Sequence, residues 1–136
     1  MEIDQKLPTI FFAYQEFASL VDLSQYDLTQ NQHRMLFIIS SLEDVNIKKI
    51  LVLIGISKQA ANVAIRDLME KGLVTEHRST VDKRVKYLQL TPEGIDLNDQ
   101  INLEQKRLLD RYFDEANGDW EKAMTKLAQK YLDRVK

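Results

Sequence analysis

The chain has 136 residues and no cysteine, so its length suits one domain, and disulfides, thiol redox sensing and thiolate metal sites are excluded. Its formal net charge is only −2, but residues 48–90 carry nine basic and four acidic side chains, a net of +5 that leaves −7 for the remainder. A basic middle between acidic ends indicates a local surface for phosphate. The alternative is a chance segregation of charge on a solvated surface.

The start of the chain and its apolar runs bear on its location. The first six residues are acidic overall and lack the basic start and long apolar run of a signal peptide. No apolar run approaches the ~20 residues that a transmembrane helix needs. We therefore expect a cytoplasmic protein with no membrane partner.

Helical patterns begin early in the chain. Pro8 marks the start of a first helix, because proline at the first helical position loses no useful hydrogen-bond donor, and this helix should end near residues 22–25. Residues 29–32, Thr-Gln-Asn-Gln, have the form of a capping box and predict the start of a second helix. The apolar side chains on one stripe of the first helix are Ile10, Tyr14, Phe17 and Val21.

Residues 50–56 are ambiguous, since the sequence Ile-Leu-Val-Leu-Ile-Gly-Ile suits a buried strand as well as a helix. The surrounding sequence favours a short helix over residues 47–54, closed by Gly55 in a left-handed conformation. Ser57 then caps another helix, which ends at Lys71-Gly72. The inward-facing side chains of that helix are Ala61, Ile65 and Leu68. Two short helices joined by a tight turn form a helix-turn-helix.

The hydrophobic period changes from helix to strand after this motif. Residues 73–78 and 85–90 predict two strands, and the polar residues 79–84 predict the turn between them. Such a hairpin, directly after a helix-turn-helix, is a wing.

Two further helices are expected after the wing. Thr91-Pro92-Glu93 combines a cap, a first-position proline and an acidic first turn, and predicts a long helix that ends near Ala116. Residues 117–119 stop that helix and cap the last one, whose apolar stripe consists of Trp120, Met124, Leu127, Tyr131 and Val135. The predicted fold class is mainly α with a small β-hairpin.

Short segments at regular spacing carry a resemblance over residues 28–97. They are Leu28-Thr29-x-x-Gln32, Ile56-Ser57-Lys58-Gln59-Ala60, the run from Leu68 to Val74, Asp82-Lys83-Arg84, and Leu90-Thr91-Pro92-Glu93-Gly94. Together, in this order, they resemble the MarR family of bacterial transcription regulators, named for multiple antibiotic resistance. The resemblance implies a winged helix-turn-helix domain flanked by N- and C-terminal dimerisation helices.

A homodimer is part of what the resemblance implies. Residues 1–27 and 92–136 would form the helical dimerisation region, and residues 28–91 the winged DNA-binding region of one structural domain. The composition of the terminal helices supports a dimer independently, because they carry more apolar surface than one small monomer needs. The aromatic side chains concerned are Phe11, Phe12, Tyr14, Phe17, Trp120 and Tyr131.

The helix that starts at Ser57 is expected to place its N-terminus in the major groove of double-stranded DNA. Ser57 and the first amides suit a phosphate, whereas Gln59 and Asn62 suit adenine edges. Val63 departs from the family pattern, which often has arginine there, so a base preference does not carry over. The alternative is an ordinary solvated helix surface. The outward positions available for contact are Ser57, Lys58, Gln59, Ala60, Asn62, Val63 and Arg66.

In the wing, Arg84 resembles the family arginine that enters the minor groove, with Asp82 two residues earlier fixing its geometry. Arg78, Lys83 and Lys86 are expected to contact phosphates. The alternative for Asp82 and Arg84 is an exposed ion pair worth ~0–1 kcal/mol.

The predicted function is that of a dimeric, sequence-specific DNA-binding transcription regulator, a ligand-responsive repressor that binds a pseudo-palindromic operator. The alternative is a winged-helix protein-interaction module that does not touch nucleic acid. An enzyme is not expected, because the sequence shows no nucleophile–base arrangement, phosphate loop or metal-ligand cluster, and we expect no cofactor and no metal.

Two sets of side chains bear on the binding of a metal or a small molecule. His33 is not favoured as a metal ligand, since the chain has two histidines and no cysteine. Tyr14, Tyr112 and Trp120 either line a pocket for a small-molecule effector of unknown identity or pack in the core or the dimer interface.

Overall fold

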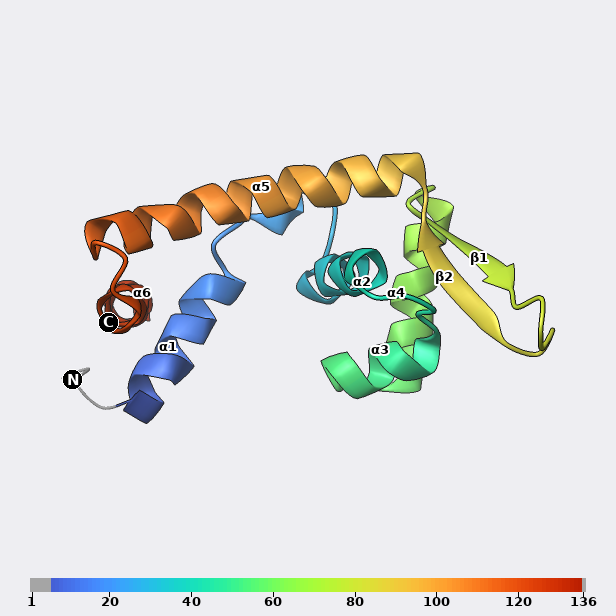
Figure 1. Cartoon of the computed structure of the whole chain (residues 1–136), viewed down its shortest axis with the longest axis horizontal. Helices are drawn as coiled ribbons and strands as arrows, with labels where there is room; N and C mark the ends of the chain where they lie inside the picture. Colours follow the sequence, from blue (N-terminus) through green and yellow to red (C-terminus); the bar gives the residue numbers. More distant parts are fainter. Residues whose placement is uncertain (1–5, 136) are drawn as a thin grey trace. The chain divides into compact units, whose positions relative to one another are not determined.

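The computed structural model describes residues 6–135, with side chains described as far as residue 133. Those residues are mostly helical, with one antiparallel hairpin, which confirms the predicted fold class. The elements (Figure 1) are α1 Lys6–Ala18, the 3-10 helix η1 Leu23–Tyr26, α2 Gln30–Ser41, α3 Ile47–Ile54, α4 Lys58–Glu70, β1 Val74–Arg78, β2 Lys86–Leu90, α5 Pro92–Glu115 and α6 Trp120–Val135.

The chain divides into two compact units. The winged unit is Leu23–Gln100, and the terminal unit falls within Met1–Asp22 and Ile101–Lys136. Helix α5 contributes its first residues to the winged unit and the rest to the terminal unit.

Local signals in the sequence set the helix ends of the winged unit. The capping box is present: Thr29 Oγ1 accepts the Gln32 amide at 3.2 Å, and Gln32 Oε1 accepts the Thr29 amide at 3.0 Å. Residues 47–54 form a helix and not a strand, and Gly55 closes it with φ +75° and ψ 34°, as predicted. The left-handed conformation there suits glycine because it has no Cβ.

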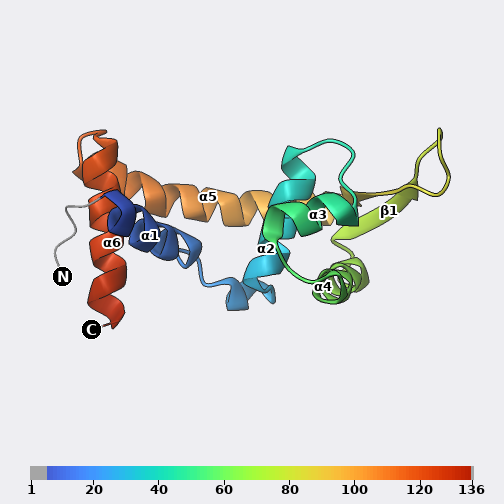
Figure 2. The same cartoon turned by 90° about the horizontal axis from the view of Figure 1, so that it is seen from below.

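A continuous apolar core joins α2, α3, α4 and the hairpin. A backbone bond from the Leu88 amide to the Val45 carbonyl, 2.8 Å long, fastens β2 to the loop before α3. The hairpin is in register from Val74 opposite Leu90 to Arg78 opposite Lys86, and beyond Val74 the residues of β1 are exposed. Its far end therefore projects away from α4 (Figure 2). The buried side chains of this core are Met35, Leu36, Ile39, Val45, Ile50, Ala61, Ile65, Leu68, Leu73, Val74, Leu88 and Leu90.

The first turn of α5 is locked to the junction between α4 and β1. Thr91 Oγ1 donates to the Gly72 carbonyl at 2.6 Å and accepts the Gly94 amide at 3.0 Å. A Cβ on Gly94 would lie 2.1 Å from the Leu73 carbonyl oxygen, so only glycine fits this close approach. Helix α4, the hairpin and the start of α5 are thus joined at this junction.

The terminal unit is made by α1, α6 and the second part of α5. Ala13, Leu127 and Ala128 form its buried centre, and Phe12 stacks on Tyr131 with ring centroids 5.9 Å apart. Partly buried apolar side chains packed against this centre are Phe12, Leu20, Leu109, Tyr112, Met124 and Leu132.

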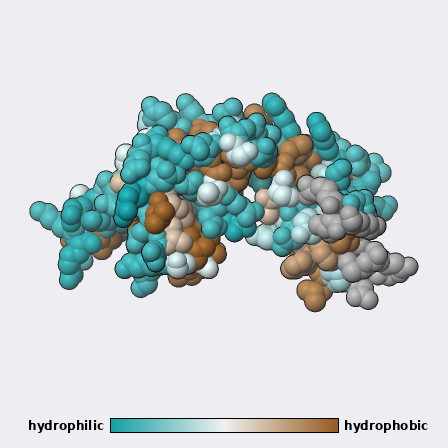
Figure 3. Space-filling view, turned by 180° about the vertical axis from the view of Figure 1, so that it is seen from behind, coloured by the Kyte–Doolittle hydropathy of each residue, from teal (hydrophilic) through white to brown (hydrophobic). Residues whose placement is uncertain are grey.

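The end of α1 differs from the sequence prediction. The helix ends at Ala18 and not near residues 22–25, because a turn follows in which the Ser19 amide bonds the Glu16 carbonyl at 3.1 Å. Its buried residues are Thr9, Ala13 and Glu16. Ile10, Tyr14 and Phe17 of the predicted apolar stripe therefore face outward, whereas Val21, beyond the end of the helix, is buried. Apolar surface over α1 is visible in Figure 3. The exposed side chains are Leu7 at 79%, Ile10 at 58%, Phe11 at 55%, Tyr14 at 51% and Phe17 at 36%.

Candidate nucleic-acid interface

Helix α4 separates a core face from an outward face. Ser57 is its N-cap, with Oγ accepting the Ala60 amide at 3.1 Å. Ala61, Ile65 and Leu68 are at most 4% exposed, as predicted. The outward residues named from the sequence are Ser57, Lys58, Gln59, Ala60, Val63 and Arg66, all exposed, and Asn62, which is half-buried. This face carries cationic, amide and hydroxyl groups at the start of a helix, which is suitable chemistry for phosphates and base edges.

The wing turn is held by side chain to backbone hydrogen bonds. Ser79 Oγ accepts the amides of Val81 at 3.1 Å and Asp82 at 3.2 Å. Arg78 Nη1 donates to the Lys83 carbonyl at 2.8 Å, across the turn. The loop that carries Lys83 and Arg84 therefore has a defined conformation.

Asp82 orients Arg84. One carboxylate oxygen accepts the Arg84 amide and Nε, and the other accepts Nη2, each at 3.1 Å. The Arg84 side chain remains 91% exposed. Hydrogen bonds from the Arg84 side chain and backbone hold the pKa of Asp82 below its ordinary value of 3.8. The guanidinium is thus presented to solvent in a fixed orientation, with the Asp82 geometry that the sequence predicted.

Two of the other predicted wing cations are engaged within the hairpin. Lys86 Nζ lies 3.5 Å from Glu76 Oε1, and Arg78 is bonded to the Lys83 carbonyl. These partners offset the repulsion between Arg78 and Lys86, which face each other across the strands. Lys83 is exposed at the turn.

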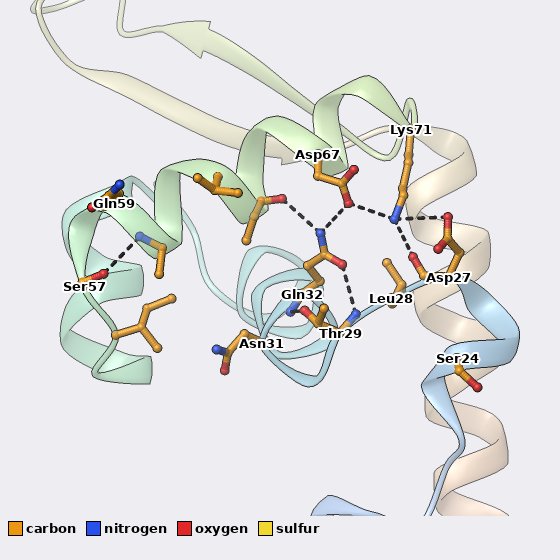
Figure 4. Close-up of a pocket in the computed structure, with 14 residues that line it drawn as sticks. Ser24, Asp27, Leu28, Thr29, Asn31, Gln32, Ser57, Gln59, Asp67 and Lys71 are labelled. Atoms are coloured by element: carbon orange, nitrogen blue, oxygen red, sulfur yellow. Dashed lines mark hydrogen bonds and ion pairs between the residues drawn. The ribbon is translucent and has the colours of Figure 1, made fainter.

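An open groove of about 1070 Å³ runs between the start of α2 and α4 (Figure 4). Ser57, Gln59 and Val63 line it together with polar residues that the sequence analysis did not single out as functional. Among these, Asp67 and Lys71 form an ion pair of 2.8 Å, and Lys71 also bonds Asp27. Lys71 and Gln32 lower the pKa of Asp67 below 3.8, and Asp67 raises the pKa of Lys71 above 10.5. The i,i+4 spacing of Asp67 and Lys71 was a signal for the pair.

The terminal unit contains a smaller apolar pocket of about 280 Å³. Tyr14 and Trp120 both line it, but Tyr112 does not, so the three predicted residues are only partly brought together. The remaining lining residues are Ile10, Ala13, Phe17, Leu109, Phe113, Met124 and Leu127. Across the described residues, no group of three or more His, Cys, Asp or Glu side chains is placed to hold a metal. Within the same residues, no helix has the length and hydropathy to cross a membrane.

Comparison with known proteins agrees with this geometry. Residues 26–85 match the model of the MarR family. The HTH-type transcriptional regulator PetP of Rhodobacter capsulatus is 28% identical over 107 residues, covering 77% of this chain. The chain spans 64% of the length of that relative.

Solved structures show the same fold. The apo form of wild-type MarR from E. coli superposes with a TM-score of 0.74 at 21% identity, covering 99% of this chain and 98% of that one. Staphylococcus aureus MarR in complex with salicylate and kanamycin superposes with a TM-score of 0.66 at 22% identity, covering 95% of this chain and 84% of that one. The family consists of transcription regulators and not enzymes, in agreement with the sequence analysis. The chain is therefore similar to the MarR family over residues 26–85 and shares the fold of solved MarR structures.

Proposed function

We propose that the chain is a dimeric, sequence-specific DNA-binding transcription regulator. The observation that carries the proposal is the Asp82–Arg84 arrangement, in which a bidentate carboxylate orients an arginine that is 91% exposed. An exposed ion pair adds little to stability, so its fixed geometry serves presentation of the guanidinium. A narrow, electronegative minor groove is the partner that suits it.

The remaining predicted contacts follow from the position of α4 in the winged unit. With the N-terminus of α4 in the major groove, Ser57 and Lys58 meet the phosphate backbone, and Gln59 and Asn62 reach base edges. Arg66 and the wing residues Arg78, Lys83 and Lys86 add cationic contacts. Val63 offers a methyl-bearing surface for a thymine methyl group.

The terminal unit supports the homodimer part of the proposal. Its outward side chains Ile10, Phe11, Tyr14 and Trp120 are each at least half exposed, which is unusual for large apolar groups that share one surface. A second copy, related by two-fold symmetry, would cover them and pair two winged units on a pseudo-palindrome, with half-sites about one helical turn apart.

Repression and response to a small ligand belong to the same proposal. The Staphylococcus aureus relative was crystallised with salicylate, a small aromatic acid. An effector that prefers one spacing of the two recognition helices would shift the dimer towards or away from the DNA-binding arrangement.

The test is a fluorescence anisotropy titration with duplexes selected from random DNA. Wild-type protein should bind a selected palindrome with an affinity that falls steeply between low and moderate salt, because phosphate contacts release counterions. Arg84→Ala should weaken binding about tenfold. Arg111→Ala is the matched control, because Arg111 is an exposed arginine of the terminal unit, and should bind like the wild type. Absence of salt-dependent binding to any duplex would favour a protein-interaction module instead.

A further inference from the structure

A buried amide connects α2 to the recognition helix. Gln32 is 4% exposed, and its Oε1 accepts the Thr29 amide in the capping box at 3.0 Å. Its Nε2 donates to Asp67 Oδ2 at 2.7 Å and to the Ala64 carbonyl at 3.3 Å, both on α4. One side chain therefore caps α2 and bonds α4 (Figure 4). The capping box accounts for the first bond only.

The contacts continue beyond Asp67. The same Oδ2 oxygen lies 2.8 Å from Lys71 Nζ, which in turn donates to the Asp27 backbone carbonyl and lies 3.4 Å from the Asp27 carboxylate. Asp27 adopts φ +55°, a left-handed conformation that turns the chain into α2. We call Gln32, Asp67 and Lys71 the α2–α4 clamp. It fixes the second half of α4 to both the start of α2 and the loop before it.

The clamp shares one groove with Ser57 and Gln59, two of the proposed DNA contacts. Gln59 and Ser57 lie at one end of it, and Asp67, Lys71 and Asp27 lie at the other (Figure 4). The core face of α4 is apolar, and apolar packing is non-directional, so by itself it permits the helix to rotate or slide by small amounts. Hydrogen bonds have preferred distances and angles, so the clamp restricts those motions.

We propose that Gln32, Asp67 and Lys71 are positioning residues for DNA recognition, which hold α4 at the rotation that its reading side chains require. This inference rests on the proposed function, because it assigns the clamp a role in sequence-specific binding. Clamp residues act through the orientation of α4 and do not touch the DNA.

A substitution of Asp67 gives a test in which two explanations predict opposite changes in DNA affinity. Asp67 is an anion on the helix proposed to meet a polyanion, so charge alone predicts that Asp67→Asn strengthens DNA binding. The clamp predicts the reverse, since asparagine keeps the shape but loses the charge that holds Lys71. Glu70→Gln is the matched control, because Glu70 is an exposed anion of the same helix.

The measurement is affinity for a selected palindrome and, separately, for a random duplex of equal length. Asp67→Asn should lower affinity for the selected site about tenfold without lowering affinity for the random duplex, because non-specific binding depends on charge and not on helix orientation. Glu70→Gln should leave both unchanged or slightly tighter. An Asp67→Asn protein that binds the selected site as tightly as Glu70→Gln does would overturn the proposal. Equal losses on both duplexes would overturn it too, since they indicate general unfolding.

Two substitutions of Lys71, one that removes the charge and one that keeps it, supply a second test. Lys71→Met removes the contacts of the ammonium with Asp67 and Asp27 and should reduce the ratio of selected-site to random-duplex affinity. Lys71→Arg retains a cationic donor for these acceptors and should restore most of that ratio. If the arginine variant loses as much specificity as the methionine variant, the clamp is not the cause.

Amide hydrogen exchange of the full chain without DNA separates this proposal from the proposed function. Asp67→Asn and Lys71→Met should speed exchange in α4 and the first turn of α2, and Glu70→Gln should not. If wild-type protein binds no duplex but the exchange differences appear, the proposed function fails while the clamp is shown to hold α4. If DNA binds and exchange is unchanged in every variant, the proposed function survives and the clamp proposal fails.

Discussion

The winged unit and the terminal unit differ in which apolar residues form their buried centres. In the winged unit, large apolar side chains from α2, α3, α4 and the hairpin meet in one buried core, and polar side chains bridge the helices. In the terminal unit, the buried centre is two alanines and a leucine, while Tyr14 and Trp120 are exposed. The difference teaches that the winged unit has a large apolar core despite exposed side chains such as Val52 and Val81, whereas the terminal unit has a small buried centre beside a row of exposed apolar side chains along α1.

The largest expected effect on stability is at Gly94, where the winged unit leaves no space for a Cβ. Gly94→Ala places a methyl group 2.1 Å from the Leu73 carbonyl oxygen, so α5 or the α4–β1 junction must shift. We expect the free energy of unfolding of this unit to fall by about 3 kcal/mol, measured by urea unfolding followed by circular dichroism. Ile95→Ala, at a neighbouring exposed position, should change it by less than about 1 kcal/mol. Equal midpoints for the two variants would contradict the tight junction.

The second effect concerns the surface that the terminal unit leaves open. Tyr14→Asp puts a charge into the proposed dimer contact and should raise the dimer dissociation constant about 100-fold, measured by sedimentation velocity across a dilution series. Trp120 is the only tryptophan of the chain and lines the same pocket, so its emission should shift to the red as the dimer dissociates.

Val81→Asp is the control for that experiment. Val81 is 95% exposed at the wing, outside the terminal unit, so the same kind of charge there should leave the oligomeric state unchanged. If the wild-type chain stays monomeric at high micromolar concentration, the exposed apolar surface of the terminal unit is not a dimer contact.

A smaller effect is expected at Val63, which is 58% exposed on the outward face of α4. Val63→Arg adds a cation beside the proposed duplex and should tighten DNA binding, with the slope of log affinity against log salt steeper by about one. Val52→Arg on α3, which is 78% exposed, is a matched control for added charge away from α4. An unchanged slope for Val63→Arg would remove this face from the interface.

The smallest effect is a pH dependence at Asp67. The pKa of Asp67 is lower in the folded chain than its ordinary value of 3.8, so at acidic pH the folded chain binds fewer protons at this carboxylate than the unfolded chain does. The stabilisation is complete above about pH 4 and is lost as the pH falls through the folded pKa. Asp67→Asn should therefore show a weaker acid dependence of its urea midpoint than wild type between pH 2.5 and 5. If the urea midpoints of the two proteins changed in parallel with pH, the predicted contribution of Asp67 would be wrong.

The winged unit could be predicted from the sequence because its signals are local. Thr29 and Gln32 are three residues apart, Gly55 follows its helix directly, and Asp82 precedes Arg84 by two residues. Each of these signals acts within a few residues, so no knowledge of the tertiary structure is needed. The conformations of the capping box, the α3 end and the wing turn followed from them.

Other features depend on contacts between distant residues. Gln32 and Asp67 are 35 positions apart, and nothing in the sequence near either one indicates their hydrogen bond. Hydrophobic periodicity identified the apolar stripe of α1, but it does not say which chain covers that stripe. The structure instead buries the opposite side, with Ala13 and Glu16, against its own unit.

The carboxylate that orients Arg84 also determines how the wing responds to arbitrary DNA. Because Asp82 stays ionised beside the guanidinium, the pair together carries no net charge, and its contribution to counterion release is small. In the proposed complex this pair would gain affinity from the shape of a groove, whereas Lys83 and the other wing cations would carry the phosphate contacts. Arg84 would then add to the preference for one groove shape without adding much to the affinity for arbitrary duplex.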